Sequence, residues 1–215
     1  MDNFITHTEA SFDEIQLLIY DAENIHYGGN QYWFPSKMHQ LSGCGPVAAA
    51  NITSYLSQTF PDKFGNLYPY QGRFNKKDYV EHMIEIRKYV RPGMFGLTSA
   101  QQFSENVLSS TNTKGIILPP HMLAERAAPM DDAIRFIVQA LYQKLSVGIL
   151  VLRHPIKELE EYAWHWMTIT HLSLDPMDNK YYISVSTYGE RRVMDLDLLW
   201  NHRRPQDIIR LVYFS

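Results

Sequence analysis

The stretch SGCGPVAAANI, residues 42–52, contains the only cysteine of the chain, Cys44, and opens a run of small and apolar residues. Proline is well tolerated in the first turn of a helix, where its missing N–H is not needed. Pro46 therefore predicts a buried helix that begins at or just before Cys44 and runs to about Ser57. The unpaired N–H groups and the dipole of a helix N-terminus stabilise negative charge. We therefore expect a lowered pKa for the Cys44 thiol and a nucleophilic sulfur.

A second interpretation of Cys44 is structural, because most free cysteines are small buried apolar residues. The glycines on both sides of it favour the functional interpretation. Glycine weakens a helix and is needed where the backbone must approach another group closely. Both interpretations stay open until a partner for the thiol is found.

Length and composition describe an ordinary globular chain. Its 215 residues are enough for one sizeable core, so we expect a single domain over residues 1–215. The net charge of −3 comes without a strongly basic block, and we expect no nucleic-acid partner. A single cysteine excludes an internal disulfide and fits a reducing compartment. No cofactor motif is present, and we expect none to be bound.

The N-terminus predicts a cytoplasmic protein. Residues 1–4 lack the basic region and apolar run of a secretory signal. No apolar stretch approaches the roughly 18 residues that a membrane-spanning helix needs. Secretion would be expected only if a signal peptide had been removed.

Hydrophobic periodicity divides the chain into a helical part and a sheet part. Helices are predicted over 76–90, with Tyr79, Met83, Ile86 and Val90 facing inward, and over 98–108 and 133–145. The continuous apolar run 147–152 predicts a central strand, and 11–23 fits either a helix or a strand. Further strands are predicted over 164–174, 181–187, 191–194 and 208–214, with a helical turn over 195–200. The order predicts an α+β fold with an antiparallel sheet, with a helical half over about 1–145 and a sheet half over about 146–215.

A nucleophilic thiol needs a base, usually histidine. Among the nine histidines, His165 stands out because it begins an apolar strand between Trp164 and Trp166. A polar group in that place needs a partner or a function. The alternative is a histidine at a strand end that lies half in solvent.

Together these features resemble the papain-like cysteine peptidase superfamily, and more closely its bacterial C39-like peptidase branch. The features are a helix opened by Gly-Cys-Gly-Pro at Cys44 and, much later, a strand that begins His-Trp at His165. The Ser-Thr-Tyr-Gly segment at 186–189 resembles the Asn-Ser-Trp-Gly of papain-type enzymes. The resemblance implies a helical half whose central helix begins at the cysteine, packed on an antiparallel sheet that carries the histidine.

The resemblance also implies an activity, a cysteine peptidase or amidase that cleaves a peptide or amide bond through a thioester acyl-enzyme. Cys44 would attack the carbonyl carbon. His165 would take the thiol proton and then give it to the leaving amine. The expected partner is thus a peptide or amide substrate.

The residue that orients His165 is argued partly from distance. Asp175 lies ten residues along the same predicted strand, roughly 30 Å away, which is too far. In a hairpin centred near Pro176, the residues opposite His165 lie around 186–190. The resemblance places the family's orienting Asn or Asp at Ser186, with Thr187 and Glu190 as nearby alternatives.

The oxyanion donor is also irregular. The family usually has a glutamine about six residues before the cysteine, and Met38 stands there in this chain. Gln40, four residues before Cys44, is the nearest candidate to hold the oxyanion together with the Cys44 N–H. The alternative is that Gln40 is a solvated loop residue.

Two rival functions follow from these departures. The serine at 186 and the displaced glutamine favour a catalytically weak or inactive C39-like relative that binds peptides. A metal site at His165 and His171 is disfavoured, because six strand residues separate them by about 20 Å.

Overall fold

A six-stranded antiparallel sheet forms the centre of the computed structural model, which describes residues 13–93, 96–123, 128–204 and 207–215. Residues 1–4, on which the expectation of no secretory signal rests, lie outside these ranges. The strand order is β4-β9-β5-β6-β7-β8. The strands are β4 (Pro120–Leu123), β5 (Val147–Val151), β6 (His165–Asp175), β7 (Lys180–Thr187), β8 (Glu190–Asp195) and β9 (Ile209–Phe214).

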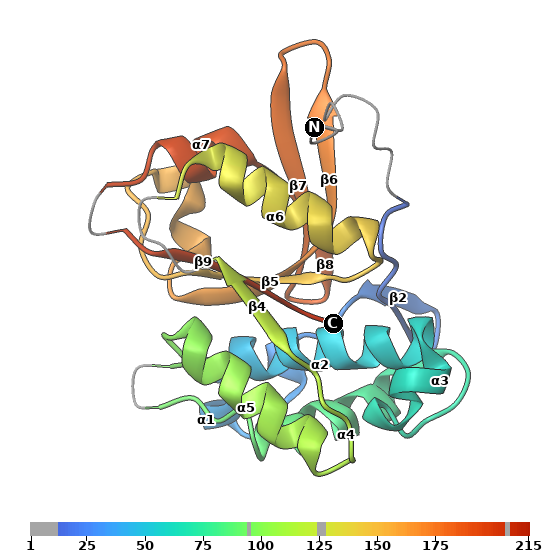
Figure 1. Cartoon of the computed structure of the whole chain (residues 1–215). Helices are drawn as coiled ribbons and strands as arrows, with labels where there is room; N and C mark the ends of the chain where they lie inside the picture. Colours follow the sequence, from blue (N-terminus) through green and yellow to red (C-terminus); the bar gives the residue numbers. More distant parts are fainter. Residues whose placement is uncertain (1–12, 94–95, 124–127, 205–206) are drawn as a thin grey trace.

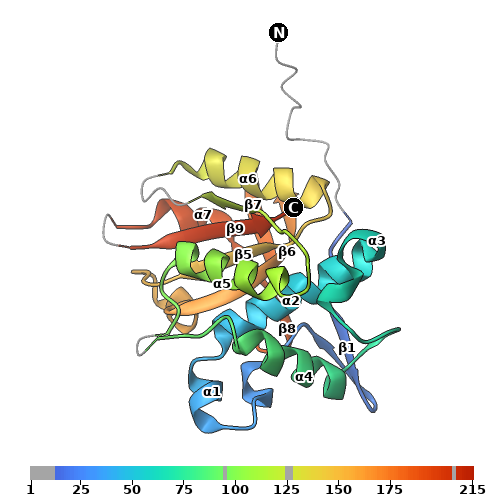
Figure 2. The same ribbon diagram turned by 60° about the horizontal axis from the view of Figure 1, so that its bottom comes forward.

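Helices cover both faces of this sheet, which explains why β5 is apolar at every position. On one face lie α2 (Cys44–Thr59) and α5 (Ala100–Asn112), with α4 (Lys76–Arg87) packed against α2. On the other face lie α6 (Met130–Tyr142) and α7 (Leu196–Asn201). Figures 1 and 2 show this arrangement from two directions, with α6 separated from α2 and α5 by the strands.

A second, three-stranded sheet lies beside the helical layer. It contains β1 (Leu18–Asp21), β2 (Asn24–Tyr27) and β3 (Phe74–Asn75), with β1 in the middle. The stretch 11–23 is compatible by sequence with a helix or a strand, and in the structure its residues 18–21 form strand β1. The remaining short elements are η1 (Gln31–Trp33), α1 (Lys37–Leu41), α3 (Pro61–Phe64), η2 (Gly65–Leu67) and η3 (Lys157–Tyr162).

The predicted α+β class is confirmed, and β5 is an interior strand of the sheet as expected. The inward set of the helix predicted over 76–90, Tyr79, Met83, Ile86 and Val90, is buried in full. The division near residue 145 is less clean than expected. Both β4 and α6 precede that point, yet β4 pairs with β9 and α6 packs on the far face of the sheet.

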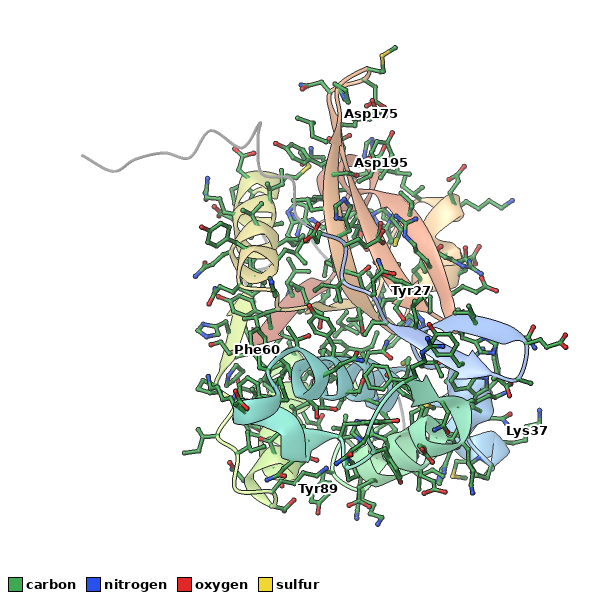
Figure 3. All side chains as sticks on the ribbon, turned by 90° about the vertical axis from the view of Figure 1, so that its right-hand side faces the viewer. Tyr27, Lys37, Phe60, Tyr89, Asp175 and Asp195 are labelled. Carbon is green, nitrogen blue, oxygen red and sulfur yellow. The ribbon has the colours of Figure 1, made fainter. Side chains whose placement is uncertain are left out.

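The β6–β7 hairpin is the longest element pair and projects beyond the helices (Figure 3). Asp175 lies at its tip, where its Oδ1 accepts a hydrogen bond from the Met177 N–H at 2.8 Å. The carboxylate therefore shapes the turn, at the opposite end of β6 from His165. This agrees with the distance argument that removed Asp175 from the candidate site.

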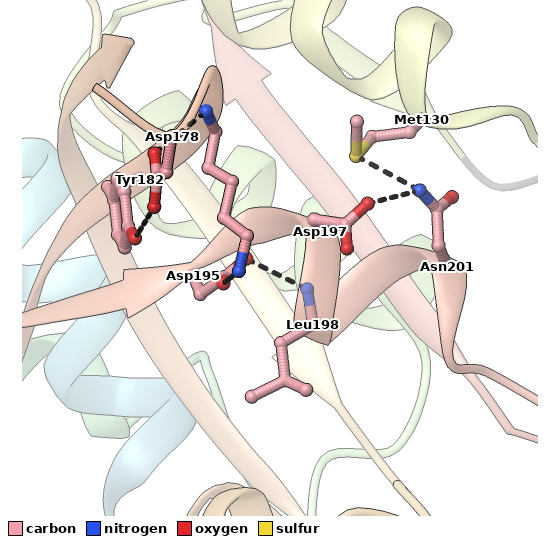
Figure 4. A network of polar contacts seen from close by, with 8 residues as sticks. Met130, Asp178, Tyr182, Asp195, Asp197, Leu198 and Asn201 are labelled. Carbon is pink, nitrogen blue, oxygen red and sulfur yellow. Dashed lines mark hydrogen bonds and ion pairs between the residues drawn. The ribbon is translucent and has the colours of Figure 1, made fainter. Parts of the chain in front are cut away.

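Polar contacts anchor α7 to the sheet and to α6 (Figure 4). Asp195 caps α7 by accepting from the Leu198 N–H at 2.9 Å, and it pairs with Lys180 at 3.2 Å. Asn201 donates to Asp197 at 2.6 Å and to the sulfur of Met130 on α6 at 3.6 Å. The start of β7, the end of β8 and both covering helices are thereby joined.

Candidate active site

Cys44 is the first residue of α2, as the glycine and proline around it predict. The turn before it is tightly packed. A Cβ at Gly43 would lie 2.7 Å from the His39 carbonyl oxygen and 2.8 Å from the Phe34 ring. Only glycine fits there, because real Cβ atoms do not approach other atoms so closely. The packing fixes where α2 begins and hence where the sulfur lies.

Cys44 and His165 line one small cavity between the N-terminal turns of α2 and the facing ends of β6 and β7. Its free volume is about 10 Å³, roughly the room that one water molecule needs. The lining residues are Gln31, Cys44, Val47, Ala48, Asn51, His165, Trp166, Met167, Ser186, Thr187 and Tyr188. The fold thus brings together the two residues singled out in the sequence, 121 positions apart.

Burial dominates the electrostatics of this pair. It raises the pKa of the Cys44 thiol, against the backbone N–H groups of Trp166, Gly45 and Cys44 itself, which lower it. The expected lowering of this pKa is therefore wrong in sign, because desolvation outweighs the helix N-terminus. Burial also lowers the pKa of His165 to about 4, although Glu161 acts in the opposite direction. Both groups are accordingly uncharged at neutral pH.

The His165 ring is held on two sides. Its Nε2 lies 2.8 Å from Thr187 Oγ1, and its face stacks on Tyr188 with ring centres 4.7 Å apart. Tyr188 in turn stacks on the exposed Tyr32, with ring centres 5.9 Å apart. Within the described residues, no hydrogen bond joins the His165 ring to the Cys44 sulfur.

Tyr188 occupies a conformation that bulky residues seldom adopt. It forms the two-residue β7–β8 turn with Gly189, and both have positive φ, 52° and 79°. Such turns favour Asn or Gly at the first position. Asn30 Nδ2 donates to the Tyr188 carbonyl at 2.6 Å, which helps to hold the turn. A non-glycine residue kept at positive φ indicates a position fixed by its surroundings.

Among the described residues, no hydrogen bond joins Ser186, the predicted orienting residue, to the His165 ring. Ser186 pairs with Thr168, three residues beyond His165 on β6. Its Oγ donates to the Tyr27 carbonyl at 2.8 Å. The residue that contacts the His165 ring is instead Thr187, the next residue of β7 and one of the two alternatives. Glu190, the other alternative, is exposed and pairs with Arg192.

Ser186 belongs instead to a buried network centred on Asn51 of α2. The Asn51 Oδ1 accepts from the Gly29 N–H at 2.9 Å and from the Tyr79 hydroxyl at 2.7 Å. Its Nδ2 donates to Thr168 Oγ1 at 3.2 Å and to Ser186 Oγ at 3.1 Å. The amide is fully satisfied and ties α2 to α4, to the β6–β7 pair and to the segment after β2.

Gln40 is also placed elsewhere. Its Nε2 donates to the carbonyls of Phe34 at 2.8 Å and Tyr32 at 3.1 Å, outside the cavity that holds Cys44. Gln40 lies in α1, two residues after the position that the family spacing gives, and it fastens the η1–α1 segment. Gln31 lines the cavity instead, and its buried Oε1 has no partner among the described residues.

The sequence reasoning missed Gln31. It stands 13 positions before Cys44, well beyond the family spacing of about six. The available signal was a polar amide at the start of the aromatic run Gln31-Tyr32-Trp33-Phe34. The packing of that run brings the amide back to the start of α2.

Comparisons with known proteins give no family for this chain. No protein-family model matches the sequence, and no curated protein matches it either. Over the described residues, no helix is both long and apolar enough to cross a membrane. In the same part of the chain, no three His, Cys, Asp or Glu side chains gather as ligands for a metal ion.

Proposed function

We propose that the protein is a cysteine hydrolase of the papain-like, C39-like type that cleaves a peptide or amide bond. The observation that carries the proposal is the shared cavity of Cys44 and His165, with Thr187 at Nε2 of the ring. A thiol at a helix N-terminus, an imidazole and a group that orients the imidazole are the parts that nucleophilic catalysis at sulfur requires.

The proton path follows from the contact with Thr187. If Thr187 Oγ1 accepts from the Nε2–H of His165, the lone pair of Nδ1 is free to act as a base. Because both groups rest uncharged, the thiol proton moves to Nδ1 as the sulfur attacks the carbonyl carbon. The C–N bond then breaks, the imidazolium gives its proton to the leaving amine, and a thioester remains. Water, deprotonated by His165, releases the acid and restores the thiol.

The oxyanion has two candidate donors in this scheme. One is the backbone N–H at the start of α2, at Cys44 or Gly45. The other is the side-chain Nε2 of Gln31, a residue that lines the same cavity. Donors fixed in a water-poor site stabilise developing charge far more than donors in solution do.

A second candidate function is a peptide-binding protein without turnover. The observations that favour it are the raised pKa of Cys44 and a cavity with room for about one water molecule. Thr187 supports it too, because a hydroxyl stabilises an imidazolium less than a carboxylate does.

Alkylation of Cys44 by a peptidyl chloromethyl ketone separates the two functions. We expect Cys44 to be the modified residue and His165→Ala to slow modification by about 100-fold, the lower end of what a general base contributes. His171→Ala is the matched control, since His171 lies on the same strand outside the cavity, and it should change the rate less than about twofold. Equal rates in the wild type and His165→Ala would reject the hydrolase and leave the binding protein.

A further inference from the structure

Arg87, the last residue of α4, reaches the turn that leads into Cys44. Its Nη2 donates to Ser42 Oγ at 3.1 Å, and its Nη1 approaches the Ser42 carbonyl oxygen at 3.5 Å. The guanidinium carbon also lies 5.6 Å from the centre of the Phe34 ring, the ring that closes over Gly43. Arg87 therefore contacts Ser42, which precedes Gly43 in the tight turn, and Phe34, which packs against Gly43.

This guanidinium is half-buried and has no carboxylate partner among the described residues. Buried arginines are usually paired, because an unpaired charge is costly to remove from water. The groups that Arg87 does contact, a hydroxyl, a carbonyl oxygen and an aromatic face, are neutral. The site thus holds a positive charge that no acidic side chain of the described residues balances.

The Cys44 sulfur is the nearby group that can become negative. Burial lowers the pKa of Arg87 and Cys44 raises it, while Arg87 lowers the pKa of Cys44. Among the described residues, His165 from β6 and Tyr188 from the β7–β8 turn line the cavity with the sulfur, and the charge of Arg87 acts on the thiol from α4. Arg87 is the cation of this set at neutral pH, because His165 is uncharged and a tyrosine carries no positive charge.

We propose that Arg87 is a positioning residue for the proposed hydrolase, which holds the turn before Cys44 and stabilises its thiolate through a charge that no carboxylate of the described residues neutralises. The inference rests on the proposed function for its purpose. Its physical content, an effect of Arg87 on the sulfur, can be measured whether or not the protein hydrolyses anything.

The test is the pH dependence of Cys44 alkylation by iodoacetamide in the full chain. The variants are Arg87→Met, Arg87→Lys and the control Arg91→Met, an exposed arginine just beyond α4. We expect Arg87→Met to raise the thiol pKa by about one unit and to slow alkylation at neutral pH about tenfold, because only the thiolate reacts. Arg87→Lys, which keeps the charge, should recover most of the rate, and Arg91→Met should match the wild type.

Salt provides a readout that a purely structural role would not move. Raising the NaCl concentration to about 1 M should reduce the difference between the wild type and Arg87→Met, since screening weakens the field of a half-buried charge. If Arg87→Met does not fold, the readout is whether about 1 M NaCl slows alkylation of the wild type and Arg87→Lys, which both keep the charge; no effect of salt on either would overturn the proposal. Lower stability of Arg87→Met with an unchanged thiol pKa and no effect of salt would overturn the proposal. Loss of the His165 dependence alone would overturn the hydrolase but leave the role of Arg87 at the sulfur.

Discussion

The imidazole of His165 is buried and contacts other side chains on two sides. A threonine hydroxyl engages one nitrogen, a tyrosine ring covers one face, and only 5% of the residue is exposed. These contacts fix the orientation of the ring while burial keeps it uncharged. A base in this environment can accept a proton only when negative charge develops beside it, for example on an attacking sulfur.

Substitutions at two neighbouring residues of β7, Thr187 and Ser186, should distinguish the orientation of His165 from the stability of the fold. Thr187→Val keeps the shape of the side chain but removes the oxygen that His165 contacts, so we expect alkylation of Cys44 by the peptidyl chloromethyl ketone to slow about tenfold. Ser186→Ala removes hydrogen bonds to Asn51 and Tyr27 and should leave that rate unchanged while lowering the free energy of unfolding by about 1 kcal/mol. The reverse pattern would return the orienting role to Ser186.

Among the elements, α2 has two separate tasks. Its first residue presents the sulfur, and its second turn carries the Asn51 amide that joins it to three other parts of the chain. Apolar burial on α2 is supplied mainly by small residues, which lets the helix approach β6 and β5 closely. The polar network fixes its position along the strands, because hydrogen bonds are directional while apolar contacts are not.

Removal of the Asn51 amide should therefore be unusually costly for a polar residue. Asn51→Ala removes one hydrogen-bond partner from a backbone N–H, a tyrosine hydroxyl and two further hydroxyls, all in the interior. The tyrosine hydroxyl keeps its contact with Ser54, and Ser186 keeps its bond to the Tyr27 carbonyl. We expect a loss of about 3 kcal/mol or more in urea unfolding. Asn112→Ala, at the exposed end of α5, is the control and should change stability by less than about 0.5 kcal/mol. Equal effects of the two substitutions would mean that the network contributes little.

For the molecule as a whole, buried histidines predict a loss of stability in mild acid. Burial lowers the pKa of His165 to about 4 and that of His82 to about 3, and Lys114 adds to the effect at His82. Both imidazoles are neutral in the folded chain and titrate near 6.5 when it unfolds. Between about pH 6 and 4.5 the unfolded state therefore binds more protons, so stability falls as the pH falls.

The expected slope is about 1.4 kcal/mol per pH unit for each histidine, about 2.7 for the two. Urea midpoints measured from pH 7 to pH 4.5 would show it. In His82→Gln, where an amide replaces the ring near Thr53, the slope should fall by about half. Carboxylates with lowered pKa values, such as Asp195 and Asp207, titrate below this window and do not obscure it. A flat profile in the wild type would contradict the burial of both rings as neutral groups.

The sequence predicted the parts of this molecule that depend on local patterns. The start of α2, the inward face of α4, the interior position of β5 and the α+β class follow from proline placement and hydrophobic period. It did not predict the small sheet around β1, because strands as short as Phe74–Asn75 leave no periodic signal. Pairs such as β4 with β9 depend on residues about 90 positions apart, which no local pattern records.

The candidate site divides in the same way. Cys44 and His165 were identified from their immediate neighbours and brought to one cavity by the fold. Ser186 was assigned because the resemblance places the family's orienting residue there, with Thr187 as an alternative. The hairpin register, including the irregularity between Ile169 and His171, has no local signal in the sequence. The choice of Gln40 over Gln31 and the pKa of the thiol both depended on packing that only the folded chain reveals.

The partners of Asn51 determine how late in synthesis α2 can complete its packing. During translation its helix leaves the ribosome well before the chain reaches Thr168 and Ser186, 117 and 135 positions later. Until those hydroxyls emerge, the Asn51 amide has only water or a chaperone as a partner, and α2 cannot pack against the strands of the large sheet. The cavity that encloses the Cys44 thiol can therefore form only after the last quarter of the chain has been synthesised.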